Sequence, residues 1–204
     1  MSSPAKPGHQ YKITIIGNSQ VGKSSLLRFY QSGEADNSSS ATLGSDFFLA
    51  SEEIDGVKVK LVVWDTAGQE KFRAVSVNNL RHAKGVVVAY SVEDRQSFED
   101  VKRWIDDVNS TCEGFALALV ANKSDIESRA VSTEEGRDLA RKLGVPLYET
   151  SIFLSKAPPS TVSIRQVFRE IAGKILENEK SQKNEEKGEK LIAKKKKKSS
   201  CCSC

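Results

Sequence analysis

The chain of 204 residues lacks a long hydrophobic run. No apolar stretch reaches the roughly 18 residues that a membrane-spanning helix needs. The first ten residues are polar, which argues against a signal peptide. Of only four cysteines, three lie within the last four residues, with no histidine near them. We therefore expect neither a structural disulfide nor a zinc site. The sequence also lacks internal repeats, so a repeat architecture is not expected.

The net positive charge of the chain is concentrated at its C-terminal end. The net charge is +4, but residues 179–204 hold nine lysines and four glutamates, a net +5, which leaves −1 for the remainder. A nucleic-acid-binding domain would carry its basic residues on the fold itself, so we expect no nucleic-acid partner. From Glu179 to Lys190 the tail is polar and has no aromatic residue, which predicts disorder.

The sequence does contain a phosphate-binding pattern, GNSQVGKS at residues 17–24, which we call the phosphate loop. An apolar, β-branched stretch precedes it and a helical pattern follows, which disfavours a chance Gly/Ser-rich turn. Gly17 and Gly22 permit a tight turn, so that backbone N–H groups point into one concavity beside the positive end of a helix. Lys23 is expected to meet the phosphates and the Ser24 hydroxyl to ligate Mg²⁺. The other loop residues expected to line the nucleotide are Ser19, Gln20, Val21 and Ser25.

A second segment, DTAGQ, follows an apolar strand. Asp65 stands at the carboxyl end of that strand, where a carboxylate can hold Mg²⁺ through its water shell. The Gly68 N–H is expected to approach a terminal phosphate, and Gln69 to orient an attacking water. Alone, this pattern is an ordinary boundary between a strand and a turn. After a phosphate loop it indicates a metal-dependent nucleotide site.

Two further segments choose the base. In NKSD, residues 122–125 (the first base loop), the Asp125 carboxylate can accept hydrogen bonds from N1–H and the 2-amino group of guanine. Adenine has neither donor and would leave the carboxylate unpaired. The Lys123 stem is expected along the base, and Asn122 is expected to tie this loop to the phosphate loop. In residues 149–152, the second base loop, a backbone N–H of Ser151 or Ile152 would meet guanine O6. Without the other segments, NKSD would indicate an ordinary polar turn.

These segments, in this order, resemble the Ras-like small GTPases. The strings WDTAGQEKFR and TLGSDF are similar to the Rab branch, and the resemblance covers about residues 11–178. It implies GTP and GDP as ligands with Mg²⁺, and it makes Thr42 the switch threonine that ligates Mg²⁺ and senses the γ-phosphate. It gives Gln69 the role of positioning the hydrolytic water. No arginine of the phosphate loop supplies charge in cis, so we expect slow turnover, on the order of 10⁻⁴–10⁻² per second, accelerated by a partner.

The fold class predicted is α/β, a single P-loop GTPase domain. Its six-stranded sheet is mostly parallel, with one antiparallel edge strand and helices on both faces. Residues 1–10 are expected to form a flexible tail, 11–178 the GTPase domain and 179–204 a disordered tail; the protein is expected to be a monomer. Strands are predicted near 11–17, 47–54, 58–65, 85–91, 115–121 and 145–149, and helices near 23–32, 70–82, 94–111, 133–143 and 163–178.

The C-terminus resembles the Cys-x-Cys ends of Rab proteins, which implies geranylgeranyl groups on Cys202 and Cys204. Cys201 is a rival acceptor or a palmitoylation site. Two lipid chains hold a protein on a membrane, and Lys194 to Lys198 can add up to about 1 kcal/mol each at an anionic leaflet. The alternatives for the lysine run are a nuclear localisation signal, in a nuclear or RNA-associated protein, and a solvated tail.

The resemblance further implies an exchange factor, a GTPase-activating protein, effectors and a prenyl-binding chaperone such as GDI. It places the protein on the cytoplasmic face of a membrane, with a cytosolic pool, in vesicle-mediated transport. Phe47 and Trp64 are either an effector-facing aromatic surface or core.

Three departures from the family pattern stand out. Gln20 replaces a small residue, Ile152-Phe153 replaces Ala-Lys, and Asn79-Leu80 replaces a pair of tyrosines. These departures motivate one alternative, a nucleotide-binding scaffold with negligible hydrolysis.

Overall fold

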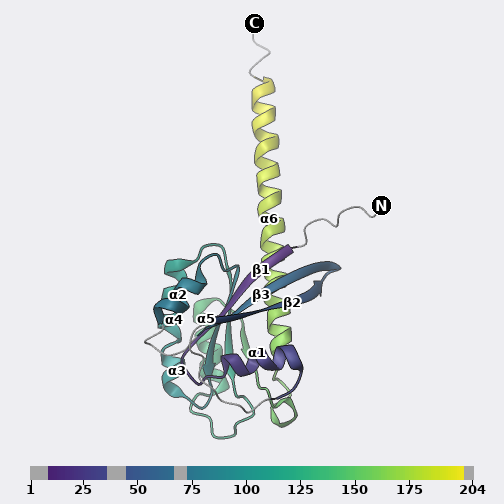
Figure 1. The fold of residues 1–204 in the computed structure, drawn as a ribbon. Coiled ribbons are helices and arrows are strands. Elements are labelled where there is room, and N and C mark those ends of the chain that lie inside the picture. Colours follow the sequence, from purple (N-terminus) through teal and green to yellow (C-terminus); the bar gives the residue numbers. More distant parts are fainter. Residues whose placement is uncertain (1–8, 36–44, 67–72, 200–204) are drawn as a thin grey trace, which may run out of the picture.

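The computed structural model describes residues 9–35, 45–66 and 73–199 (Figure 1). Within these residues the chain alternates strands and helices in the predicted order. The strands are β1 (His9–Ile16), β2 (Ser45–Ile54), β3 (Val57–Thr66), β4 (Gly85–Ser91), β5 (Ala116–Asn122) and β6 (Leu147–Glu149). The helices are α1 (Lys23–Ser32), α2 (Arg73–Leu80), α3 (Arg95–Glu99), α4 (Val101–Thr111), α5 (Thr133–Leu143), the 3₁₀ helix η2 (Leu154–Lys156) and α6 (Ile164–Ser199).

The strands form one six-stranded sheet in the order β2-β3-β1-β4-β5-β6. Only the β2–β3 pair is antiparallel; the other pairs are parallel. The turn between β2 and β3 has positive φ at Asp55 and Gly56, 50° and 74°, as a tight hairpin requires. The α/β class and the antiparallel edge strand are therefore confirmed.

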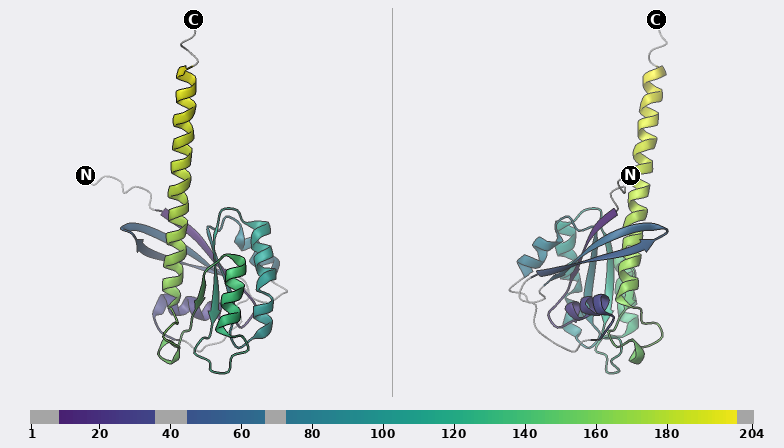
Figure 2. Two further views of the ribbon diagram at one scale, coloured as in Figure 1. Left: turned by 180° about the vertical axis from the view of Figure 1, so that it is seen from behind. Right: turned by 45° about the vertical axis from the view of Figure 1, so that its right-hand side comes forward.

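Two hydrophobic cores lie on the two faces of the sheet. One core joins the sheet to α1 and α6, and it includes Ile13, Leu26 and Phe168. The other joins it to α2, α4 and α5, and it includes Leu80 and Trp104. Figures 1 and 2 show helices on both sides of the sheet. Every residue of β4 is buried, because this strand lies between β1 and β5 and is covered on both faces. This packing holds the carboxyl ends of the parallel strands at one edge, where the site lies.

The helix predicted over residues 94–111 is interrupted. Asp94 caps α3 by accepting hydrogen bonds from two backbone N–H groups, α3 ends at Glu99, and α4 begins at Val101. Asp100 stands between them, and its carboxylate accepts hydrogen bonds from side chains of the phosphate loop and of α3. The periodicity of apolar residues is the same on either side of Asp100, so it does not reveal the break.

The last helix differs most from the sequence prediction. Disorder was expected from Glu179, but α6 continues to Ser199. Glu179 itself is bonded to β1: its Oε2 lies 3.1 Å from His9 Nδ1 and accepts a 3.0 Å hydrogen bond from the Tyr11 hydroxyl. The following segment is rich in Glu and Lys, which are good helix formers, and has no proline. In both views of Figure 2, α6 extends well beyond the sheet.

No helix among the described residues has the length and apolarity required to cross a membrane.

Phe168 should be a major source of stability. Its side chain is fully buried, and its ring meets that of Tyr30 edge-on at 5.3 Å. We expect Phe168→Ala to lower the free energy of unfolding by about 3–5 kcal/mol, because it leaves a cavity between α6 and the sheet. Urea unfolding measures this change. Leu49→Ala, at an apolar side chain that is 72% exposed, is the control and should change stability little. Equal effects of the two substitutions would contradict the assigned packing.

Candidate nucleotide site

The phosphate loop connects β1 to α1 in a conformation that requires both of its glycines. Gly17 has φ 141°, and a Cβ there would lie 2.1 Å from the Ala89 carbonyl oxygen of β4. Gly22, the N-cap of α1, has φ 91°, and a Cβ there would lie 2.4 Å from Asn122 Nδ2. The loop is therefore packed tightly between β4 and the first base loop. Gln20 also has positive φ, 64°, and its side chain is exposed.

Lys23 is buried at the start of α1, and its ammonium group faces the phosphate loop. Its Nζ donates hydrogen bonds of 2.9 Å to the Gly17 carbonyl and 2.8 Å to the Asn18 carbonyl. Burial lowers the pKa of Lys23 to about 8, although the nearby Asp65 carboxylate opposes the shift. Within the described part of the chain, the hydrogen bonds of this ammonium go to neutral carbonyl oxygens, so the buried cation would gain from an anionic ligand.

Ser24 and Asp65 lie together at the same edge of the sheet. The Ser24 hydroxyl donates a hydrogen bond to Asp65 Oδ2. The other oxygen, Oδ1, is buried and has no hydrogen-bond partner among the described residues. Burial raises the pKa of the Asp65 carboxyl, since it disfavours the charged form. An orphaned carboxylate oxygen beside a hydroxyl is the donor set that a hard divalent cation such as Mg²⁺ prefers, so these residues fit the predicted metal.

Asn122 joins the first base loop to the phosphate loop, as the sequence predicted. Its buried side chain donates from Nδ2 to the Val21 carbonyl at 2.7 Å, and its Oδ1 accepts a 3.2 Å hydrogen bond from Thr150. The Ser124 N–H also donates to the Thr150 carbonyl at 3.1 Å. One amide side chain therefore holds the phosphate loop and both base loops in contact.

The residues predicted to meet the base lie close to one another. The Ser151 hydroxyl donates to Asp125 Oδ1 at 2.5 Å, so the two base loops meet at these side chains. Lys123 has positive φ, 62°, and its ammonium is paired with Glu93. The half-buried Ile152 side chain packs against the hydrophobic core that joins the sheet to α1 and α6. Its bulk is accordingly accommodated by the core.

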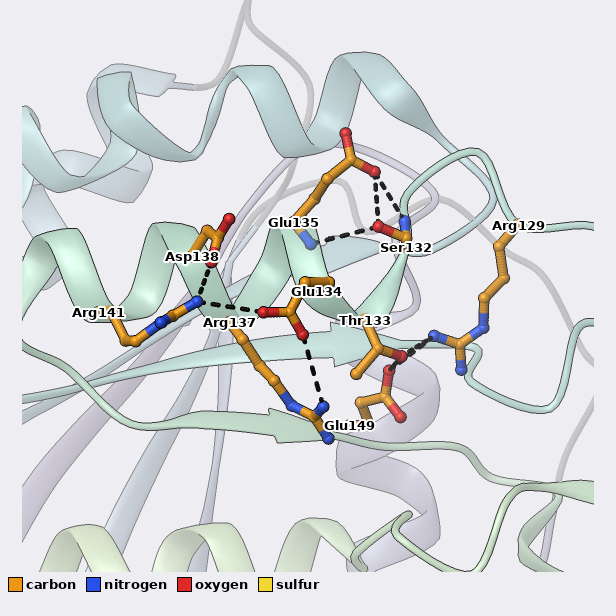
Figure 3. Close-up of polar contacts among 9 residues, drawn as sticks. All are labelled: Arg129, Ser132, Thr133, Glu134, Glu135, Arg137, Asp138, Arg141 and Glu149. Carbon is orange, nitrogen blue, oxygen red and sulfur yellow. Dashed lines mark hydrogen bonds and ion pairs between the residues drawn. The ribbon is translucent and has the colours of Figure 1, made fainter.

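Arg129 braces the base loops and was missed in the sequence analysis. It donates to Ser124 O at 3.1 Å and to Glu149 Oε1 at 2.6 Å, and Thr133 donates to the same carboxylate oxygen at 2.6 Å. Figure 3 shows Arg129, Thr133 and Glu149 converging beside α5. Burial alone raises the pKa of Glu149, but the hydrogen bonds from Arg129 and Thr133 outweigh it, so the pKa is lower than usual. No sequence pattern connects these three positions, which come from separate elements.

Other predicted residues lie outside the described part of the chain. They are Thr42, Gly68 and Gln69 near the phosphates, and Cys201, Cys202 and Cys204 at the C-terminus. Of the remaining loop residues, Val21 is buried, whereas Ser19 and Ser25 are half-buried.

The aromatic residues of β2 and β3 form part of the surface. Phe47 is 52% exposed and stacks on Trp64 with ring centroids 5.2 Å apart. The Lys12 ammonium lies 4.8 Å from the centroid of the Trp64 ring. Asn79 and Leu80, which replace the expected tyrosines, are at the end of α2: Leu80 is fully buried, and the Asn79 carbonyl accepts a hydrogen bond from the Thr14 hydroxyl. Phe47 therefore lies at the surface and not in the core, while its contact with effectors stays a prediction.

Comparison with known proteins gives consistent matches. The Ras family model matches residues 12–177. The chain is 42% identical over 175 residues to Ras-related protein RABA5b of Arabidopsis thaliana, covering 83% of this chain and 80% of that protein. It is 43% identical over 191 residues to Ras-related protein RABA5c of the same plant, covering 91% and 89%. It is 38% identical over 168 residues to Ras-related protein Rab-18 of Caenorhabditis briggsae, covering 81% and 80%.

Removal of the Asn122 amide should destabilise the whole site. We expect Asn122→Ala to lower the free energy of unfolding by about 1–3 kcal/mol, because the Val21 carbonyl loses its buried donor. Urea unfolding of the purified protein measures this. Asn109→Ala, the same change at an exposed position of α4, should stay within about 0.5 kcal/mol. An unchanged midpoint for Asn122→Ala would show that the contact does not secure the loops.

Proposed function

The chain belongs to the Ras family as a Rab-like small GTPase, and on that premise we propose that it is a Mg²⁺-dependent, membrane-anchored GDP/GTP switch. One observation carries the proposal. The phosphate loop presents a buried Lys23 ammonium beside the Ser24 hydroxyl and the orphaned Asp65 oxygen. Nucleotide phosphates with a bound cation satisfy all three groups at once.

The phosphates are proposed to lie in the phosphate loop. The N–H groups of residues 19–25 and the N-terminus of α1 favour negative charge there, and Lys23 adds a full positive charge. Ser24, Thr42 and, through water, Asp65 are the proposed Mg²⁺ ligands. When bound, the cation neutralises charge on the β- and γ-phosphates. Gly68 is proposed to approach the terminal phosphate through its N–H.

Guanine is proposed to lie between the two base loops. The hydrogen bond from Ser151 to Asp125 brings the two loops together, which supports the proposal that guanine N1–H and the 2-amino group donate to the Asp125 carboxylate. The backbone at Ser151 and Ile152 is the proposed partner of O6, and Lys123 covers the base. Arg129 holds both loops in this arrangement.

Hydrolysis is proposed to rely on electrostatics and positioning. Lys23 stabilises charge that develops on the transferred phosphoryl group, and Gln69 orients the attacking water. Without a cis arginine in the phosphate loop, turnover should be slow until a GTPase-activating protein supplies the missing charge. Loss of the γ-phosphate then releases the contacts that Thr42 and Gly68 make with it, which changes the surface offered to effectors.

The proposed setting is the cytoplasmic face of a membrane in vesicle transport. Geranylgeranyl groups on Cys202 and Cys204, with Lys194 to Lys198 near the leaflet, provide the anchor. A prenyl-binding chaperone such as GDI maintains a cytosolic pool, and an exchange factor reloads GTP. Effectors are proposed to dock on the stacked rings of Phe47, which is exposed, and Trp64, which is half-buried. The protein is proposed to act as a monomer.

The nucleotide proposal is tested first. Purified protein should release GDP when it is denatured and chromatographed, and after reloading with GTP and Mg²⁺ it should release phosphate slowly. Gln69→Leu should slow phosphate release about tenfold or more, because the attacking water is no longer oriented. Gln166→Leu, the same change on the exposed surface of α6, is the matched control. An empty site, or GTP that persists in the unaltered protein, would favour a scaffold without hydrolysis.

Membrane anchoring has its own test. In cells, replacing both Cys202 and Cys204 by Ser should move the protein from the membrane fraction to the soluble fraction, since the polybasic run alone holds weakly. Cys201→Ser should leave the distribution unchanged. Retention of the double variant on membranes would refute the assignment, and a shift caused by Cys201→Ser alone would transfer the role to Cys201.

A further inference from the structure

Asn18 is a residue of the phosphate loop that no recognised motif position explains. Its side chain points away from the loop and forms hydrogen bonds with Asp100, between α3 and α4, and with Trp104 of α4. Its Oδ1 accepts a 2.8 Å hydrogen bond from the Trp104 indole, and its Nδ2 donates a 2.6 Å hydrogen bond to Asp100 Oδ2. Asp100 is the residue that separates α3 from α4, and Trp104 lies one turn further along α4. The phosphate loop is therefore tied to the point where the helix is interrupted.

The chemistry of the two partners leaves one orientation for the Asn18 amide. An indole N–H can only donate, and an ionised carboxylate can only accept. The Asn18 oxygen must therefore face Trp104, and the nitrogen must face Asp100. Trp104 is buried, and the other Asp100 oxygen accepts a 3.2 Å hydrogen bond from Gln96 Nε2. Both partners are thus fixed to the fold, so the amide is held from two sides.

The same residue also holds the phosphate-binding lysine. The Asn18 carbonyl accepts a 2.8 Å hydrogen bond from Lys23 Nζ, and the neighbouring Gly17 carbonyl accepts another. The position of the Asn18 backbone therefore determines where the buried ammonium of Lys23 rests. A continuous path of hydrogen bonds runs from the α3–α4 junction through Asn18 to the group that meets the phosphates.

We propose that Asn18 is a positioning residue, and that the Asn18–Asp100–Trp104 brace sets the residence time of the bound nucleotide. The proposal rests on the proposed nucleotide-binding function. The brace holds the phosphate loop in the shape that presents Lys23, so disturbing it speeds nucleotide release without removing any group that touches the nucleotide base. The α3–α4 junction, distant in sequence from the site, becomes a determinant of nucleotide exchange.

A reciprocal exchange of the two side chains provides the test. Asn18→Asp places a second carboxylate against Asp100 and should speed dissociation of a fluorescent GDP analogue, with Mg²⁺ present, about tenfold. Asp100→Asn alone keeps a carbonyl acceptor for the Asn18 amide and should stay within about twofold of the unaltered protein. The double variant restores one carboxylate that accepts from both the Trp104 indole and the new amide at position 100. It should return the rate to within about twofold.

Rescue by the double variant separates a positioning role from general damage. Asn109→Asp, the same chemical change at an exposed site of α4, should leave the dissociation rate unchanged. If Asn18→Asp does not fold, Asn18→Ala replaces it and should speed release by about three- to tenfold. Unaltered release in the Asn18 variants, or a double variant as fast as Asn18→Asp, would overturn the brace. Absence of bound GDP in the unaltered protein would instead refute the proposed function.

Discussion

The hydrogen bond from the Asn122 amide to the Val21 carbonyl is the contact on which the geometry of the site depends. It is buried, and it links the end of β5 to a loop whose residues lie about a hundred positions earlier in the chain. The close approach of these two loops leaves no space for a Cβ at Gly22. Thr150 completes the arrangement through its own hydrogen bond to Asn122. The phosphate loop and the base loops are thus coupled by one side chain, because neither can shift without leaving a buried polar group unpaired.

The site holds two ionisable groups, Lys23 and Asp65, whose charged forms are disfavoured by burial. Lys23 is a buried cation whose pKa is lowered, and Asp65 is a buried carboxylate whose pKa is raised. Each is therefore held in an environment that disfavours its charge. In the proposed complex, phosphate oxygens and a divalent cation would reverse both penalties, and binding would gain from groups that are already in place and need little reordering. The glycine-rich turn and the surrounding hydrogen bonds provide the rigidity that keeps these charges close to one another.

Local sequence patterns predict most of the fold, whereas they do not predict the side-chain hydrogen bonds between residues far apart in the sequence. The alternation of strands and helices, the hairpin at Asp55 and the contact of Asn122 all follow from short, directional signals in the sequence. The interruption at Asp100 does not follow from them, and neither does the hydrogen bond of this residue to Asn18, which lies 82 positions away. The role of Arg129 is equally invisible, since its partners come from different elements. The polar composition after Glu179 predicts disorder, whereas α6 continues to Ser199, in keeping with the high helix propensity of Glu and Lys.

The residues that depart from the family pattern, among them Gln20, Leu80 and Ile152, lie at positions where the fold accommodates their side chains. The half-buried Ile152 side chain packs against one of the two cores, which accommodates its bulk. Gln20 extends into solvent from a residue with positive φ, so its bulk lies on the outer surface of the phosphate loop. Leu80, the last residue of α2, is buried where the family pattern has a tyrosine, whereas the Phe47–Trp64 stack remains at the surface. Gln20 therefore changes an exposed surface, whereas Leu80 and Ile152 are accommodated by packing against the two cores. None of the three disturbs the described contacts of Lys23, Asp65 or Asn122, so the grounds for a scaffold that binds nucleotide without hydrolysis are weak, and partner choice is where this chain should differ most from its relatives.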